Sequence, residues 1–163
     1  MRSYYLIRVI YKRKSIFLIW YSDNEDGFLV SEQGLLMFTG IAEAKSFAKK
    51  REILLESEVT VYDFSNVIEL IKGIDCSENC HILINIWNFF SDLAKSINER
   101  FIGDFDDGLT IDIYNKLFYG SNLKALKKDD KEYHPVFNEE EIQRCISIYD
   151  NGLSILDRQF DQT

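Results

Sequence analysis

The sequence predicts a single α+β domain, in which an N-terminal antiparallel sheet packs against several C-terminal helices. Residues 1–62 are rich in β-branched and aromatic residues and contain turn signals, whereas residues 63–163 repeat apolar residues at helical spacing. The 163 residues are as many as one ordinary domain holds, since single cores usually contain roughly 100 to 200 residues. No long linker interrupts them. We therefore expect one domain over residues 1–163, with mainly strands and one helix in the first range and mainly helices in the second.

The N-terminal part carries the strand signals. The predicted elements are strands at 4–12 and 15–22, a turn at 23–27, and further strand material at 28–40 that is broken at Gly34. Between the first two strands, the polar pair Arg13-Lys14 is short enough for a tight hairpin. Because antiparallel sheets of this kind usually bury one face, another element must cover their apolar side chains.

An amphipathic helix over residues 41–55 is expected to provide this cover. Its apolar residues recur three and four positions apart, whereas lysines and glutamates point elsewhere. The apolar positions are Ile41, Ala44, Phe47, Ala48 and Leu54.

The rest of the chain is predicted to be mainly helical. After a short strand at 58–62, helices are expected from Asp63 or Ser65 to Lys72, from Asp75 to Ile97, over 111–119, and from Asn138 to about Gln159. Gly73 should end the first of these in a left-handed conformation. The last begins with a capping residue and three glutamates, whose charge suits the positive end of a helix dipole. The polar segment 124–134 should be exposed.

Net charge separates the two parts of the chain. The 19 basic and 27 acidic residues give −8, and residues 1–60 carry +1 while residues 61–163 carry −9. Binding to phosphate backbones or to anionic lipid headgroups requires clustered Lys and Arg. The sequence therefore disfavours nucleic-acid and membrane-surface binding and favours a cationic protein partner.

Several features are typical of a cytoplasmic protein. The longest apolar stretches, such as 82–86, fall far short of the ~20 residues that span a bilayer, and basic residues flank the N-terminal apolar run on both sides. We expect neither a membrane anchor nor a signal peptide. The three cysteines cannot all pair with one another, and a chain of this length needs no disulfide to hold its core.

Two metal-site patterns are incomplete. Residues 104–108 resemble a calcium loop, but the glycine comes one position early and Asn115 stands where a bidentate glutamate is needed. Possible zinc ligands are Cys76, Cys80, His81 and either Cys145 or His134. Their one local cysteine pair lacks the spacing of a zinc knuckle. We therefore predict no metal and no cofactor.

No catalytic pattern is complete either. None of the eight glycines lies in the glycine-rich turn that a nucleotide site needs, and only two histidines are present as bases for a nucleophile. The carboxylates cluster in polar runs, whereas a catalytic carboxyl is typically isolated in an apolar pocket. We predict no catalytic residue and no enzymatic activity.

Three segments of the second half resemble a known family. They are IWNFFSDL (86–93), YNKLFYGSNL (114–123) and YHPVFNEEE (133–141). These segments follow a strand-rich N-terminal part, and in this order they resemble the small cytosolic immunity proteins of bacterial polymorphic-toxin and contact-dependent growth inhibition systems. The resemblance covers mainly residues 80–155. The resemblance implies a protein that binds the toxic C-terminal domain of a delivered effector and blocks it, at its active site or beside it.

Many such toxins are basic nucleases, and an acidic protein is well suited to bind and inhibit them. Its carboxylates would occupy the positions of substrate phosphates, and opposite charge accelerates encounter. The residues expected at the contact surface are Asp104, Asp106, Asp107, Tyr119, Asp129, Asp130 and Glu132, with Glu139, Glu140 and Glu141 as a second cluster. The oligomeric state stays open.

Two other functions stay open at this point. One is a small hydrolase or transferase with a pocket between sheet and helices, and the other is an adaptor that binds another basic protein. A concave pocket with convergent polar groups would favour the enzyme, whereas a broad acidic face would favour the inhibitor.

Overall fold

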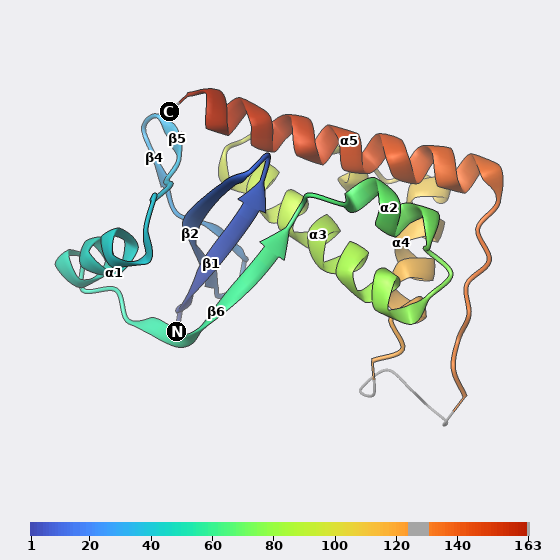
Figure 1. Cartoon of the computed structure of the whole chain (residues 1–163), viewed down its shortest axis with the longest axis horizontal. Helices are drawn as coiled ribbons and strands as arrows, with labels where there is room; N and C mark the ends of the chain where they lie inside the picture. The colour runs from blue at the N-terminus through green and yellow to red at the C-terminus, as the bar shows by residue number, and fades with distance from the viewer. Residues whose placement is uncertain (124–130, 163) are drawn as a thin grey trace. The chain divides into compact units, whose positions relative to one another are not determined.

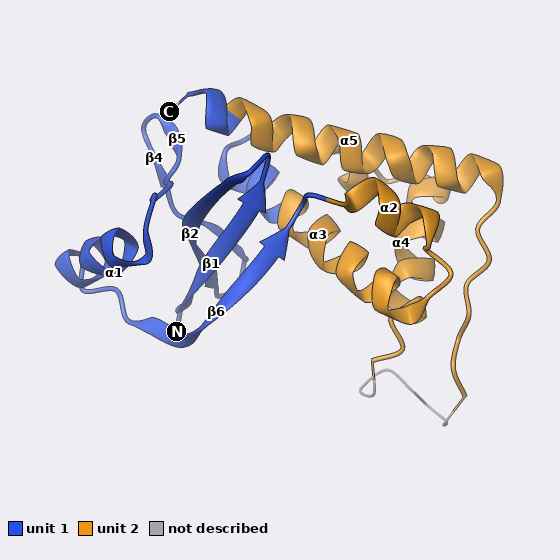
Figure 2. Cartoon of the chain, viewed as in Figure 1, with its two compact units in different colours: residues 1–65, 92–99, 159–163 blue, residues 66–91, 100–158 orange. Residues whose placement is uncertain are grey.

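Figure 1 shows the computed structural model of the chain, which describes residues 1–123 and 131–162. The order of elements confirms the α+β class, with strands dominating up to residue 63 and helices after it. The chain forms two compact units, coloured separately in Figure 2. Unit 1 comprises residues 1–65, 92–99 and 159–163, and unit 2 comprises residues 66–91 and 100–158. The predicted single domain over 1–163 stays a prediction.

Unit 1 contains a four-stranded sheet in the order β3-β2-β1-β6. Its strands are β1 (Ser3–Tyr11), β2 (Lys14–Ser22), β3 (Gly27–Phe28) and β6 (Leu55–Asp63). Strand β1 pairs antiparallel with β2 and parallel with β6, so the sheet is mixed rather than purely antiparallel. The reason is the connection before β6. Helix α1 (Ile41–Lys50) lies between β5 and β6 in the chain and returns it to the start of β1, where Leu55 pairs with Tyr4.

The β1–β2 hairpin is confirmed, with its turn one residue earlier than predicted. Lys12 and Arg13 occupy the turn, and both take a positive φ, of 48° and 61°. Turns of this hand match the twist of the flanking strands, although they normally select Asn and Gly. A second small hairpin pairs β4 (Val30–Ser31) with β5 (Gly34–Leu35), where Gly34 takes a φ of 115°.

Helix α1 covers one face of the sheet, as predicted. Ala44 and Ala48 are buried in one apolar cluster with Leu6 of β1 and Ile19 of β2. The other face contacts the C-terminal part of α3 (Ser77–Ser96) within unit 1. There the indole N–H of Trp20 donates to Asp92 at 2.9 Å.

The end of α1 differs from the prediction. The helix ends at Lys50 rather than at residue 55, because Glu52 takes a φ of 56° and the N–H of Ile53 turns back to the carbonyl of Ala48 at 2.9 Å. Leu54, which was expected on the buried side, is consequently 89% exposed. Strand β6 then begins directly, three residues earlier than predicted. Ile41 was also expected to be buried and is exposed.

Unit 2 is helical. Its elements are α2 (Val67–Lys72), α3 up to residue 91, the 3-10 turn η1 (Ile102–Asp104), α4 (Gly108–Gly120) and α5 (Glu139–Asp161) up to residue 158. The four helices predicted after residue 62 are confirmed, with small shifts at their ends. Gly73, however, has a φ of −105°, so α2 ends without the left-handed glycine that was predicted.

Aromatic rings form the core of unit 2. Trp87 is buried and makes edge-on contacts with Phe101, Tyr114 and Tyr149, at centroid separations of 6.2, 5.5 and 6.0 Å. The hydroxyl of Tyr149 donates to the Leu83 carbonyl at 2.7 Å, which satisfies its one buried polar group. This core holds α3, α4 and α5 together and thereby positions the surface described below.

Across residues 1–123 and 131–162, no helix combines the length and the apolar character that a bilayer crossing requires.

Candidate interaction surface at helix α4

Helix α4 begins at a side-chain cap. Asp107 is extended and accepts both the N–H and the hydroxyl of Thr110, each at 2.9 Å, which satisfies a free donor at the helix start. Arg144 of α5 donates to the same carboxylate at 3.1 Å. The two hydrogen bonds from Thr110 chiefly, and Arg144 to a smaller extent, hold the pKa of Asp107 below its usual value. Asp107 was predicted as a contact residue, and the structure gives it the role of fixing the start of α4.

The loop before α4 is anchored to both long helices. Ser91 of α3 donates its hydroxyl to Asp104 at 2.7 Å, and the N–H of Ile102 donates to the side chain of Asn151 on α5 at 2.9 Å. With the Asp107 cap at its other end, the loop is held on both sides. Its intervening residues, Phe105 and Asp106, therefore project from a fixed backbone.

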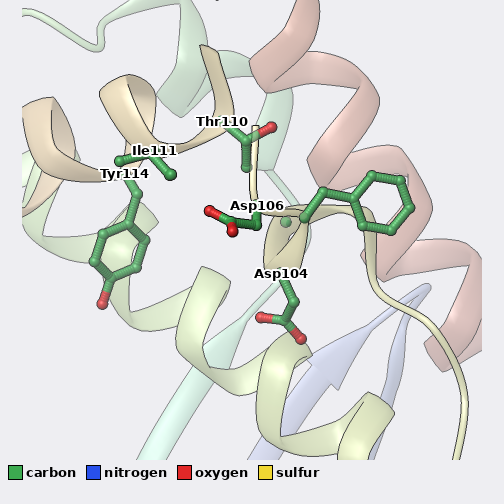
Figure 3. A pocket seen from close by; sticks show the side chains of 7 residues that line it. Asp104, Asp106, Thr110, Ile111 and Tyr114 are labelled. Carbon is green, nitrogen blue, oxygen red and sulfur yellow. The ribbon is translucent and has the colours of Figure 1, made fainter. Parts of the chain in front are cut away.

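A shallow hollow of about 230 Å³ lies between this loop and the first turns of α4. Its lining residues are Gly103, Asp104, Phe105, Asp106, Thr110, Ile111 and Tyr114. Figure 3 shows Asp104 and Asp106 projecting from the loop side and Tyr114 from the helix side. In the part of the chain that the structure describes, Asp106 makes no hydrogen bond or ion pair, so its charge is directed to solvent.

Apolar side chains continue this surface along α4. Ile111, Tyr119 and Phe105 are all exposed. The rings of Tyr114 and Phe118 stack at 6.3 Å, and Tyr119 meets Phe118 edge-on at 5.3 Å. Exposed apolar groups beside carboxylates are typical of a protein interface. We name this region the α4 surface and define it by Asp104, Phe105, Asp106, Ile111, Tyr114, Phe118 and Tyr119.

Glu141 does not lie at a surface. It is 5% exposed, and its carboxylate accepts the ammonium of Lys116 at 2.6 Å. It also accepts the N–H of Asn138 at 2.8 Å, while the Asn138 side chain accepts the N–H of Glu141 at 2.9 Å. This reciprocal pair is a capping box. It confirms Asn138 as the predicted cap and assigns Glu141 to the start of α5 rather than to a partner contact.

The other predicted contact residues are scattered. Glu139 and Glu140 are exposed on the first turn of α5, and Glu132 is exposed beside His134, with 3.6 Å between carboxylate and ring nitrogen. Asp129 and Asp130 lie outside the described residues. Of the predicted set, Asp104 and Asp106 line the same hollow, whereas Tyr119 lies in the last turn of α4 beside Phe118.

Three apolar residues of the α4 surface, Phe105, Ile111 and Phe118, were not predicted from the sequence, whereas Tyr119 was. Ile111, Tyr114 and Phe118 recur at the spacing of one helical face, beside the buried positions Ile113 and Leu117. The helix therefore carries more apolar residues than its buried side requires. That excess was a usable signal for an interface.

Two of the three cysteines, Cys80 and Cys145, are buried, whereas Cys76 is exposed. Burial chiefly raises the pKa of the Cys80 thiol to about 11 and that of Cys145 to about 12, so both are neutral at pH 7. Among residues 1–123 and 131–162, no three His, Cys, Asp or Glu side chains are placed to hold a metal ion.

A second hollow, of about 260 Å³, lies elsewhere in unit 2. It is lined by Lys72, Ile74, Asp75, Pro135, Val136, Phe137 and Ile142. Its lining is mainly apolar, with one charge of each sign, and it lacks the acidic character of the α4 surface.

Comparisons found no family model, no curated protein and no solved structure that matches this chain. The α4 surface is therefore interpreted from its own chemistry.

Proposed function

We propose that the chain is an immunity protein that binds and neutralises the toxic C-terminal domain of a delivered bacterial effector, and that the α4 surface contacts this domain. The observation that carries the proposal is the combination of an exposed carboxylate, Asp106, with exposed apolar side chains on an anchored backbone. Such a surface suits a partner that presents Lys or Arg beside an apolar group. The resemblance of residues 80–155 supports the same assignment, since that range includes α4.

The distribution of charge supports a basic partner. Unit 2 carries 15 acidic and 9 basic residues, a net −6, whereas unit 1 carries 12 and 10, a net −2. An acidic field attracts a basic protein at a distance and raises the rate of productive encounters. A basic nuclease domain fits this field, because carboxylates can take the place of its substrate phosphates.

The size of the hollow favours docking of a partner side chain over binding of a small-molecule substrate. Its volume of about 230 Å³ falls below the roughly 300 Å³ at which small-molecule sites usually begin. Its carboxylates and aromatic groups lie on an open surface, where a protein partner can reach all of them together.

The proposal is tested by co-expressing the chain with the C-terminal domain of the effector encoded beside it. We expect the chain to restore growth of a host that produces this domain, and the two proteins to elute as one complex in size-exclusion chromatography. Failure both to restore growth and to form the complex would overturn the proposal, as would a gene neighbourhood without such a domain.

A matched pair of alanine substitutions tests whether the partner contacts the α4 surface. Ile111 on the α4 surface is 43% exposed and Ile68 on α2 is 37% exposed, so each loses a similar side chain on substitution by alanine. We expect Ile111→Ala to weaken the complex about tenfold, and Ile68→Ala to leave it unchanged. Equal affinities in a titration calorimetry experiment would place the contact away from α4.

A further inference from the structure

Strand β6 is an edge strand whose side chains are exposed on both faces of the sheet. It stands at one end of the strand order, at the free margin of the sheet in Figure 1. Residues 56–61 are all exposed, and they include two valines, Val59 at 36% and Val61 at 53%. Valines in such positions would gain burial if a further strand joined the sheet.

The backbone of β6 presents hydrogen-bonding groups at this free edge. The N–H of Phe64 donates to the Ile10 carbonyl of β1 at 2.9 Å. Successive residues of a strand direct their backbone groups to opposite edges. Counting back from Phe64 through the regular register, Val59 and Val61 direct their N–H and C=O groups away from β1. An incoming strand can pair with these groups.

Two of the usual protections of an edge strand, Lys or Pro in the strand and a short length, are missing in β6. Natural edges are commonly short or carry Lys or Pro, whereas β6 has nine residues and neither of these. One irregularity of register precedes Val59, and the pairing with β1 is regular from there to Asp63. The charged residues of β6 are Glu56, Glu58 and Asp63.

We propose that the free edge of β6 is a docking site for an extended segment of a protein partner, in which Lys or Arg alternates with apolar residues. The apolar residues would pack beside Val59 and Val61, and the basic residues would reach Glu58 on the opposite face. Among the described residues, Arg8 of β1 forms no ion pair with Glu58, and its guanidinium donates to Ser15 of β2 at 2.9 Å. The inference goes beyond the proposed function, because it requires nothing of the α4 surface.

The negative charge of β6 favours a basic partner over a second copy of this chain. Pairing two β6 strands would place six carboxylates at one joint, with no basic residue in either strand. Like charges across a strand pair are destabilising, whereas opposite charges contribute favourably. A basic strand is therefore the occupant that the edge fits.

The test uses the full chain and a capped seven-residue peptide that alternates lysine and valine. We expect binding to slow deuterium exchange of the Val59 and Val61 amides about tenfold at saturation, because both N–H groups become paired. The same peptide with glutamate in place of lysine should bind about tenfold more weakly. Absence of lysine-peptide binding, binding without this protection, or equal binding of the two peptides would overturn the inference.

Two variants of the chain separate strand pairing from general attraction. Val61→Pro removes an outward N–H and leaves the β1 ladder intact, so it should fold and bind the lysine peptide about tenfold more weakly. Glu58→Lys should weaken binding similarly, whereas Glu25→Lys in the exposed turn before β3 should not. Wild-type affinity in both Val61→Pro and Glu58→Lys would refute the docking site.

Discussion

Glu141 and Lys116 form an ion pair of which the carboxylate is almost fully buried, with 2.6 Å between nitrogen and oxygen. Burial by itself raises the pKa of Glu141, but hydrogen bonds from Lys116 and from the N–H of Asn138 outweigh it and hold the pKa below the usual 4.5. A carboxyl whose pKa is lowered on folding stabilises the protein above its unfolded-state pKa. That stability is lost as pH falls through the folded-state pKa.

We therefore predict that Glu141→Gln lowers the free energy of unfolding by about 2 kcal/mol at pH 7, because it leaves the Lys116 ammonium without its partner. The loss should shrink as pH falls below 4.5, because the unfolded chain takes up its proton first and the folded wild-type carboxylate is protonated only at its lower pKa. Urea unfolding between pH 3 and pH 7 measures both effects. Glu140→Gln, one residue earlier and exposed, is the control and should change stability little at any pH. A Glu141→Gln loss that is equally large at pH 3 would contradict the assigned ion pair.

Only part of the role of Glu141 could be predicted from the sequence. Asn138 followed three residues later by a glutamate is capping-box spacing, so the role of Glu141 in the cap was readable in the sequence. Its pairing with Lys116, 25 residues away, was not, because it depends on how α4 packs beside α5. Without that contact, three consecutive glutamates are equally consistent with a solvated face.

At the scale of elements, α3 and α5 pack closely where Gly152 meets Phe90. A methyl group added at Gly152 would overlap the Phe90 ring, which is itself buried. We predict that Gly152→Ala lowers the free energy of unfolding by about 1 to 3 kcal/mol, because the core must shift to admit it. Thermal or urea unfolding measures the change.

Gly108→Ala is the matched control for this substitution. An added methyl at Gly108 meets no atom within 4 Å, and alanine is the better helix former at the start of α4. Its stability should be unchanged or slightly higher. If both variants lost the same free energy, helix packing at Gly152 would not be the cause.

Sequence patterns were most reliable for these helices and least reliable for the margins of the sheet. The apolar spacing over 75–97 predicted both ends of α3 closely, because that stripe is buried along its length. The region around residue 54 was misjudged, since apolar Leu54 fits the helical spacing but the backbone leaves the helix at Glu52. The parallel pairing of β6 with β1 followed from the path of the chain through α1, which no local pattern records.

At the scale of the whole molecule, negative charge is unevenly distributed between the two units. Most of the net −8 lies in unit 2, and the α4 surface contributes Asp106, which makes no hydrogen bond or ion pair among the described residues. Overall acidity alone would attract any basic protein. A specific interface predicts that reversing a charge at the contact changes the association rate more than reversing an equal charge elsewhere on the surface.

The measurement that tests this claim most directly is the association rate constant with the neighbouring effector domain, by stopped-flow fluorescence as a function of salt. Asp106→Lys and Asp26→Lys change net charge equally, and Asp26 is an exposed residue of unit 1 outside the α4 surface. We predict that Asp106→Lys slows association about tenfold at low salt and flattens its salt dependence, whereas Asp26→Lys slows it less than about twofold. Equal rate constants for the two variants would contradict the account.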